Sequence, residues 1–328
     1  MSGSDGARVI GVWDTQVMPP SIGGVLILAA ELHALTMIYD LDIMGVCFVG
    51  QPSNVLSVSA TVVNDNTLTR LDRESCRNSM LISMLLNIQG IDNCYVAWTL
   101  NQVHDYVSSR QMPCLTWPGL DVLTECGSIA HQYSTTIFLQ RFHAEYGSIP
   151  LLSVKEGPMR WALEFIEKHV APYIPVVVHL KNDGCHSHCS NANFDEWLAF
   201  FKASALRHKI KFLIIGNEEI DDRIRTLNNV LVTRDLKSNL VGELALIQVS
   251  AAFMGMSSGP CNMAILGAVP YVIYKNPDHD YDQMCIELGK NNQFSFARPC
   301  QTLLRVFETK ESLMYEMENI LAYIDYSD

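Results

Sequence analysis

The segment with the strongest chemical signal is 257–262, Ser-Ser-Gly-Pro-Cys-Asn, which stands between a short apolar run and a stretch of small residues. A glycine lets a ligand approach the backbone, serine caps a helix, and proline suits the first helical position. Exposed amides at a helix start favour an anion. The segment therefore predicts a diphosphate site made by Ser257, Ser258, Gly259, Pro260, Cys261 and Asn262. A capped helix that binds nothing would show the same pattern.

A second polar loop, 181–191, follows the apolar run IPVVVHL. The amine of Lys181 could neutralise a phosphate, and Asn182, Ser190 and Asn191 could donate hydrogen bonds; Asn191 or Asn193 could instead cap the next helix. The loop also contains Cys185, His186, His188 and Cys189. Their spacing is cramped and has no second ligand pair at the usual separation for tetrahedral zinc. We therefore predict no metal site.

Polar residues also follow two further apolar runs, with Asn217 after FLIIG and Arg234 after VLV. Glu243 stands near the start of the helical pattern LVGELALIQ. These three side chains could hold the ribose and base of a nucleotide, or they could only cap and solvate the turns. For each residue alone the second interpretation is favoured, whereas together they would line one side of a cleft.

In the first half of the chain, Asp14 ends the run VIGVWD and could act as a general base toward a hydroxyl. An Asx turn is an equally good interpretation of this aspartate. Gly23 and Gly24 could let the backbone come close to a bound group at a helix start. His33 lies on an apolar helical face and is predicted to be packed. The weaker base candidates are His104, Asp121 and His131, and the triplet at 278–280 is interpreted as a hinge or a substrate contact.

The elements that must position these residues alternate between short apolar strands and amphipathic helices, which is typical of a parallel α/β sheet. Continuous apolar runs such as VVV and FLII suit a sheet buried on both faces. The prolines at 172 and 175 suggest a boundary that divides the chain into two α/β domains, 1–172 and 173–328. We predict two Rossmann-like open parallel-sheet domains with the chemistry in the cleft between them. The predicted strands are 8–13, 42–49, 94–98, 150–154, 174–180, 211–217, 229–235, 252–256 and 269–274, and the predicted helices are 24–35, 74–87, 132–144, 158–169, 194–207, 240–250, one opening at 257 and 312–324.

Composition excludes partners more than it identifies them. The 328 residues carry 23 basic and 35 acidic side chains, a net charge of −12, which argues against a nucleic-acid-binding protein. We see neither a secretory signal nor an apolar window long enough to cross a bilayer, so no transmembrane segment is expected. The ten cysteines show no dense framework and are interpreted as reduced thiols. These features favour a cytoplasmic protein, and an oligomer is possible.

The organisation of the chain resembles that of GT-B-type glycosyltransferases, best over 175–328. The most specific part is LVGELALIQVSAAFMGMSSGPCNMAILGAVPYVIY, which is similar to the donor half of bacterial heptosyltransferase-like enzymes. Ser258, Gly259 and the turn Gly267-Ala268-Val269-Pro270 occupy the matching positions, whereas Cys261-Asn262-Met263 stand where that family often has a histidine. The segment His179-Leu180-Lys181 resembles the His-x-Arg strand end of fucosyltransferase-like GT-B enzymes, with lysine in place of arginine.

The resemblance implies transfer of a sugar from a nucleoside-diphosphate-sugar donor to a glycan or small-molecule acceptor. It also implies that 1–172 is the acceptor-side domain and that 173–328 is the nucleotide-sugar-binding domain. Asp14 would be the base, while Lys181 and the 257–262 amides would stabilise the leaving diphosphate without a metal ion or a cofactor. One alternative is a nucleotide-sugar hydrolase or epimerase with the same donor pocket. Another is a non-catalytic sugar-nucleotide-binding or scaffold protein.

Overall fold

The chain folds into two compact units, Met1–Lys155 and Glu156–Asp328, and each is described by itself. The structure is a computed structural model that describes residues 6–50, 69–70, 79–110, 112–120, 135–182, 190–207, 209–279, 281–288 and 292–327. The division falls before helix α8 (Glu156–His169), whereas the sequence suggested one at 172/173. Helix α8 packs on α11 (Leu240–Val249) so closely that a Cβ on Gly242 would lie 2.5 Å from the Trp161 ring. That contact makes α8 part of the second unit.

The first unit contains a five-stranded sheet in the order β3-β4-β2-β1-β5. Four strands are parallel, and the two-residue edge strand β3 pairs antiparallel with β4. Helix α5 contacts β4 and β5, and helices α4 and α7 contact α1. The elements are β1 (Arg8–Asp14), α1 (Ile22–Tyr39), β2 (Asp42–Val49), β3 (Thr69–Arg70), α4 (Met80–Leu86), β4 (Cys94–Ala97), α5 (Leu100–Ser108), β5 (Cys114–Trp117) and α7 (Ile137–Tyr146).

Helix α1 is the central helix of the first unit. It begins after Ser21, whose hydroxyl accepts a hydrogen bond from the Gly24 amide at 3.1 Å. It is long and apolar enough to cross a membrane by length and composition, with a mean hydropathy of 1.7. However, 67% of that window is buried, and the helix packs on β1, β2, α4 and α7. Its apolar side chains are therefore mostly buried, as in a core helix.

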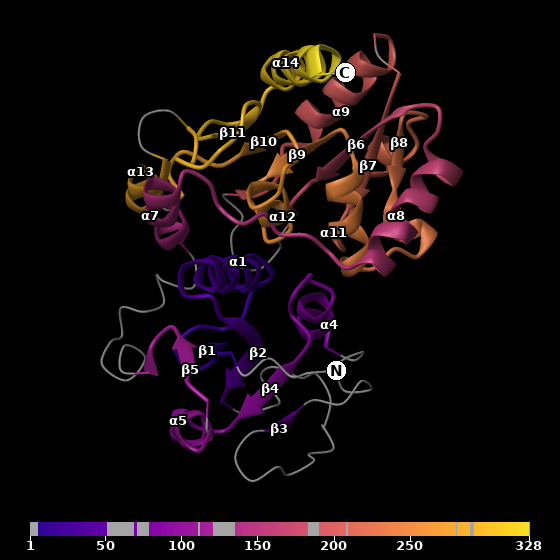
Figure 1. Ribbon diagram of the computed structural model, residues 1–328. Helices are drawn as coiled ribbons and strands as arrows, with labels where there is room; N and C mark the ends of the chain where they lie inside the picture. Colours follow the sequence, from indigo (N-terminus) through magenta and orange to yellow (C-terminus); the bar gives the residue numbers. More distant parts are fainter. Residues whose placement is uncertain are drawn as a thin grey trace. The chain divides into compact units, whose positions relative to one another are not determined.

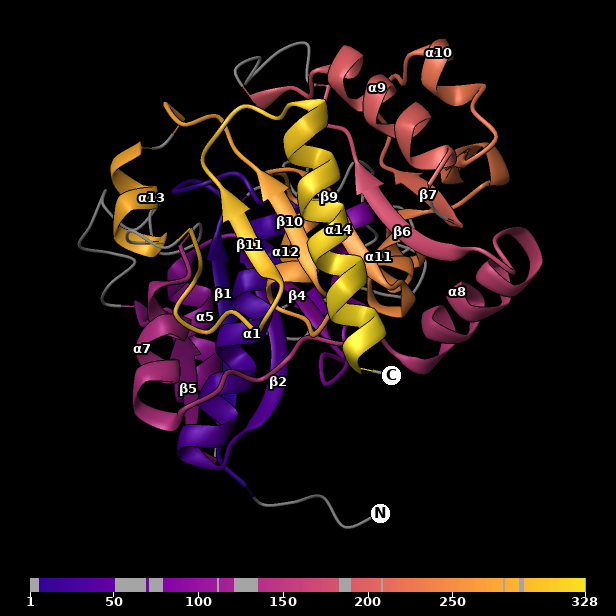
Figure 2. The same cartoon turned by 90° about the horizontal axis from the view of Figure 1, so that it is seen from above.

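The second unit contains six parallel strands in the order β11-β10-β9-β6-β7-β8. Figure 1 shows α9 and α14 on one face of this sheet and α11 and α12 on the other, and Figure 2 shows α14 lying across its face. The elements, after α8, are β6 (Ile174–His179), α9 (Phe194–Ala205), β7 (Ile210–Ile215), α10 (Asp222–Arg225), β8 (Val230–Val232), a 3-10 turn (Thr233–Leu236), α11, β9 (Ala252–Met256), α12 (Cys261–Ile265), β10 (Tyr271–Tyr274), α13 (Tyr281–Leu288), β11 (Gln301–Leu304) and α14 (Lys310–Ser327).

The core between the second sheet and α9 and α14 explains why the apolar runs become central strands. Alternate strand residues, such as Val176 and Val178, point to this side and contact aromatic side chains of α9. The rings of Phe201 and Phe212 lie 4.8 Å apart. Asn193 caps α9 by accepting a hydrogen bond from the Glu196 amide, as one of the two asparagine interpretations predicted. This packing holds the carboxyl ends of the strands in fixed register.

Most predicted elements are present, with differences at their ends. The predicted strand 150–154 is wrong, because this segment makes only one isolated antiparallel bridge, from Val154 to Ile88. Strands β3, β5 and β11 and helices α5, α10 and α13 were not predicted. The segment 55–64, whose sequence fits either an edge strand or an irregular connection, lies outside the described residues.

Candidate functional site

The carboxyl edge of the second sheet gathers most of the predicted site residues. Strand β9 lies between β10 and β6, and β7 follows β6. The chain therefore leaves neighbouring strands at Lys275, Ser257, Leu180 and Gly216. Ligands of open parallel sheets bind outside this edge.

The 257–262 turn is built from its own backbone and from Cys261. The Ser257 amide donates to the Tyr274 carbonyl at 2.8 Å, which ties the turn to β10. The buried thiol of Cys261 donates to the Ser258 carbonyl at 2.8 Å. The Asn262 side chain donates to the Gly259 carbonyl at 3.3 Å. No hydrogen bond within the described part of the chain uses the amides of Gly259 and Cys261.

The predicted serine cap of the following helix is wrong. Helix α12 has five residues, the residue at its N-cap is Pro260, and no side chain caps it. The Ser258 hydroxyl is instead buried and has no hydrogen-bond partner among the described residues. A helix this short adds little dipole, so any anion affinity of the turn rests on its amides and on nearby cations.

Two lysines place positive charge at this turn. Burial raises the pKa of Cys261 to about 11, while the charges of Lys275 and Lys181 oppose that rise. Lys181, which was predicted, follows β6 and is half-buried. Lys275, which was not, follows β10 and has a side chain only 6% exposed. Both amines are therefore close enough to Cys261 to act on its charge.

Lys275 belongs to a small polar cluster that the sequence did not reveal. Its amine lies 3.4 Å from Nδ1 of His279, and the buried hydroxyl of Ser190 lies 2.8 Å from the same nitrogen. His279 comes from the 278–280 triplet, which was interpreted as a hinge or a substrate contact. The cluster links the loop after β10 to the loop before α9.

His179, the last residue of β6, forms a second polar pair at this edge. Its Nε2 lies 3.1 Å from the Glu218 carboxylate, and its buried Nδ1 has no hydrogen-bond partner in the part of the chain that the structure describes. Burial alone would raise the pKa of Glu218, but the hydrogen bond and charge of His179, with backbone amides at Asn217 and Glu218, lower it. Gly216 has φ of 100°, and a Cβ there would lie 2.2 Å from the Glu218 carboxylate. Glycine is therefore required for the pair.

Glu243 lies inside the second unit rather than on its surface, with 5% of its side chain exposed. It accepts hydrogen bonds from the Gly216 amide at 3.1 Å, from the Thr233 hydroxyl at 3.0 Å and from the Ser238 hydroxyl at 2.6 Å. These bonds join the turns that follow β7 and β8. Glu243 thus supports the loops in which the predicted nucleotide contacts lie.

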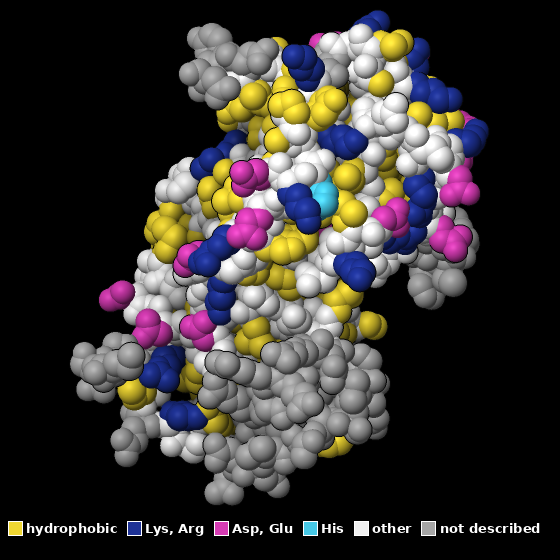
Figure 3. Space-filling view, turned by 90° about the vertical axis from the view of Figure 1, so that its right-hand side faces the viewer, with side chains coloured by type: hydrophobic (Ala, Val, Ile, Leu, Met, Phe, Trp, Pro, Cys, Tyr) yellow, Lys and Arg dark blue, Asp and Glu magenta, His cyan; other side chains and the backbone are white. Residues whose placement is uncertain are grey.

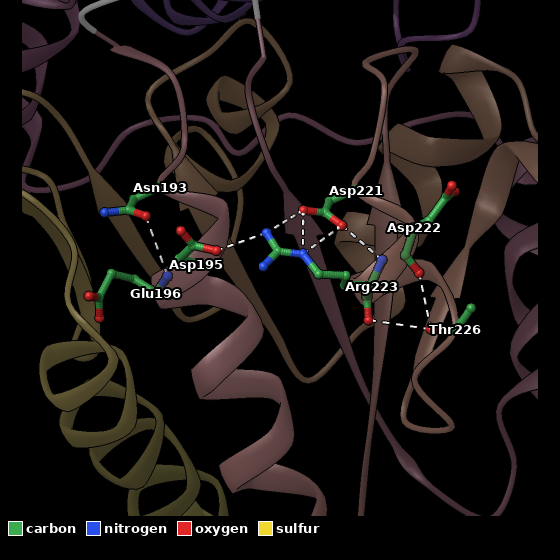
Figure 4. Close-up of polar contacts among 7 residues, drawn as sticks. All are labelled: Asn193, Asp195, Glu196, Asp221, Asp222, Arg223 and Thr226. Atoms are coloured by element: carbon green, nitrogen blue, oxygen red, sulfur yellow. Dashed lines mark hydrogen bonds and ion pairs between the residues drawn. The ribbon is translucent and has the colours of Figure 1, made fainter.

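Asn182 and Arg234 meet in a pocket of about 500 Å³, lined also by Phe194, Glu219, Ile220, Asp221, Asp222 and Arg225. Asn182 donates to the Glu219 carbonyl at 3.1 Å. Beside the pocket, Arg223 bridges Asp221 at 2.6 Å and Asp195 at 2.8 Å, as Figure 4 shows. Asn217 is exposed next to this region. Three of the predicted nucleotide contacts therefore lie around the ends of β6, β7 and β8.

In the first unit, Asp14 lies at the carboxyl end of β1 with 7% of its side chain exposed. Its carboxylate accepts a hydrogen bond from the Gln16 amide at 2.8 Å, so the Asx-turn interpretation is confirmed. Gly23 and Gly24 are buried in the first turn of α1, and the Gly24 amide is occupied by Ser21. Roles for these three residues toward an acceptor stay predictions.

The other candidates give little support for catalysis. His33 packs as predicted, with Nε2 2.9 Å from the Gln89 carbonyl. His104 is exposed on α5 beside Asp105. Residues 183–189, Asp121 and His131 lie outside the described residues. The described residues contain no group of three side chains that could hold a metal ion. On the face drawn in Figure 3, basic and acidic side chains are interspersed.

No family model and no curated protein sequence matches the chain, but solved structures do. ADP-heptose LPS heptosyltransferase II of E. coli matches with a TM-score of 0.58 at 10% identity, over 97% of this chain and 99% of that one. A family 9 glycosyl transferase of Veillonella parvula gives 0.54 at 12% identity, over 96% and 97%. The E. coli heptosyltransferase WaaC with ADP gives 0.51 at 11%, over 95% and 99%.

These likenesses establish the fold. The chain is an α/β protein with the GT-B fold of family 9 glycosyltransferases, and the predicted fold class is confirmed. The similarity spans both units, including the first, where the sequence resemblance was weak. At this identity it does not extend to donor, acceptor or reaction.

Proposed function

We propose that this protein is a glycosyltransferase that moves a sugar from a nucleoside diphosphate to an acceptor hydroxyl. The observation that carries the proposal is the convergence of Lys181, Lys275 and the 257–262 turn at one sheet edge. The turn offers two amides without internal partners, and both lysines act on it. The GT-B fold supports the same conclusion.

In this proposal the two phosphates lie against Gly259 and Cys261, with Lys181 and Lys275 as counter-charges. The leaving diphosphate gains negative charge as the bond to the sugar breaks. Amides and amines fixed before the reaction stabilise that charge most effectively. The positive charge comes from the protein, so the proposed reaction needs neither a metal ion nor a cofactor.

The nucleoside is proposed to lie toward β7 and β8, where Asn182, Asn217 and Arg234 can donate hydrogen bonds. Glu243 acts behind them by holding the turns together. The acceptor is proposed to bind the first unit near Gly23 and Gly24, with Asp14 as the base that takes its proton. The Gln16 amide uses one acceptor site of Oδ1, and the proposed base would take the proton at another acceptor site of the carboxylate.

Calorimetric titration with a panel of nucleoside diphosphates tests the donor site. Removing one charged phosphate contact typically costs about 1.5–3 kcal/mol, so Lys275→Met should weaken binding by about tenfold or more. Lys202→Met, on the exposed side of α9, is the matched control and should change nothing. Equal affinity in Lys275→Met and in the control would remove Lys275 from the site.

Assays of donor consumption with each sugar form then separate three functions. A glycosyltransferase consumes the donor only when an acceptor hydroxyl is present. Turnover without an acceptor would indicate a hydrolase or an epimerase. Tight binding without turnover under every acceptor condition would indicate a non-catalytic sugar-nucleotide-binding protein.

A further inference from the structure

A pocket lies at the end of the first sheet opposite Asp14, where the strands begin. Its volume is about 400 Å³, within the range of small-molecule sites. It is lined by Arg8 at the start of β1, Met44 of β2, Cys114 at the start of β5, and residues of the connection between α5 and β5 that include Ser109, Arg110 and Met112. Nothing in the proposed sugar transfer uses this edge.

The pocket contains two guanidinium groups with different surroundings. The half-buried side chain of Arg8 makes neither an ion pair nor a hydrogen bond within the described part of the chain. Asp42 is opposite Arg8 in the parallel register, yet no ion pair joins them. Arg110 donates to the Tyr106 hydroxyl and lies over that ring, 4.1 Å from its centre. Tyr106 thus orients one cation without neutralising it.

The pKa of the Cys114 thiol depends on the charged side chains of the pocket. Burial raises the pKa of its thiol, and the charges of Arg110 and Arg8 oppose the rise. Both guanidinium groups are therefore close enough to stabilise a negative charge at one point of the lining. In a chain of net charge −12, two arginines that face one cavity, with no acidic side chain among the described residues of its lining, are a local exception.

We propose that this pocket binds a small molecule that carries a phosphate or carboxylate on an apolar body. The two arginines would hold the oxyanion, for which their planar donor groups are well suited. Met44 and Met112 would cover the apolar part, and Ser109 offers a further hydrogen bond. The site is separate from the proposed donor site, and either proposal can fail without the other.

Alkylation of Cys114 tests the proposal at the pocket itself. The full chain is treated with iodoacetamide, and the rates at Cys114 and Cys300 are measured by peptide mass spectrometry. Phenyl phosphate and benzoate are the probes. Inorganic phosphate and phenol are the comparison compounds, because the first lacks the apolar body and the second lacks the charge. We expect saturating phenyl phosphate or benzoate to slow alkylation of Cys114 at least about fivefold, with Cys300 unchanged and phenol without effect.

Variants then assign the protection to the arginines. Arg8→Gln should raise the phenyl phosphate concentration needed for half-protection about tenfold or more, and Arg8→Lys should restore part of the affinity. Arg141→Gln, on the exposed surface of α7, is the matched control. Circular dichroism checks that each variant is folded. Protection that is absent in the unaltered chain, equal for phenol, or unchanged in both Arg8→Gln and Arg110→Gln would overturn the proposal.

Discussion

Glu31 provides a quantitative test of how the first unit is built. This residue of the apolar helix α1 is 6% exposed, and its carboxyl accepts a hydrogen bond from Trp117 Nε1 at 2.8 Å. Burial raises the pKa of Glu31 from 4.5 to about 8, although the Trp117 hydrogen bond acts in the opposite direction. In the folded unit the carboxyl is therefore neutral at pH 7, whereas in the unfolded chain it is ionised.

The sign of the effect follows from proton linkage. Below pH 4.5 the Glu31 carboxyl is protonated in both the folded and the unfolded state, so its ionisation does not change the free energy of unfolding. As the pH rises from 4.5 toward 8, the unfolded chain gains stability by about 1.4 kcal/mol for each pH unit. The free energy of unfolding therefore falls progressively over this range, and the fall levels off above about pH 8. The total loss in the free energy of unfolding is on the order of 5 kcal/mol.

Replacing Glu31 with glutamine removes this penalty while keeping the shape and an acceptor for Trp117. We expect Glu31→Gln to stabilise the first unit relative to the original chain, by an amount that grows between pH 5 and pH 8 and is constant at higher pH. Hydrogen exchange of peptides from α1, measured in urea at each pH, reads this unit separately from the second. Glu145→Gln, an exposed carboxyl on α7, is the control. A Glu31→Gln effect that does not vary with pH would refute a neutral buried carboxyl.

Three further predictions concern the proposed donor and acceptor sites. Ser258→Ala combined with Gly259→Val should weaken nucleoside diphosphate binding, since the turn loses its close approach; calorimetry measures this, and unchanged affinity would contradict it. Lys181→Ala should lower donor turnover about tenfold or more with an unchanged melting temperature, because one phosphate counter-charge is lost; equal turnover would remove Lys181 from the site. Asp14→Asn should reduce kcat by about 10²-fold or more with donor binding retained, and an unaffected kcat would eliminate it as the base.

The second sheet shows what could be predicted from sequence. The runs VVV and FLII are buried on both faces, and such runs have few alternatives to a central parallel strand. The stretch at 150–154 has similar apolar composition but crosses the surface, with 41% of Leu151 exposed. Composition alone does not separate a strand from an extended connection, because the distinction depends on a neighbouring strand with free hydrogen-bonding groups.

The site was predictable where its members form one continuous segment or directly follow an apolar strand. The 257–262 turn could be predicted because it is one continuous segment. Lys275 obeys the rule that drew attention to Lys181, since each follows an apolar strand within two residues. That signal was available and was not used. The pairing of His179 with Glu218 was not available, because it requires the register that places the end of β6 beside the end of β7.

The thiol of Cys261 connects the electrostatics of the turn with the proposed chemistry. Transfer of a sugar leaves a diphosphate whose charge must be stabilised where water is scarce, and a buried thiolate has the same requirement. Burial dominates at Cys261 and keeps the thiol neutral at pH 7, while Lys275 and Lys181 lower its pKa from what burial alone would give. The lysines thus place a positive potential at the turn before any substrate is present. A diphosphate bound at the turn would keep part of its hydration and would still be attracted by the amines of Lys181 and Lys275. The same two charges that fail to ionise a buried thiol can therefore stabilise a more exposed leaving group.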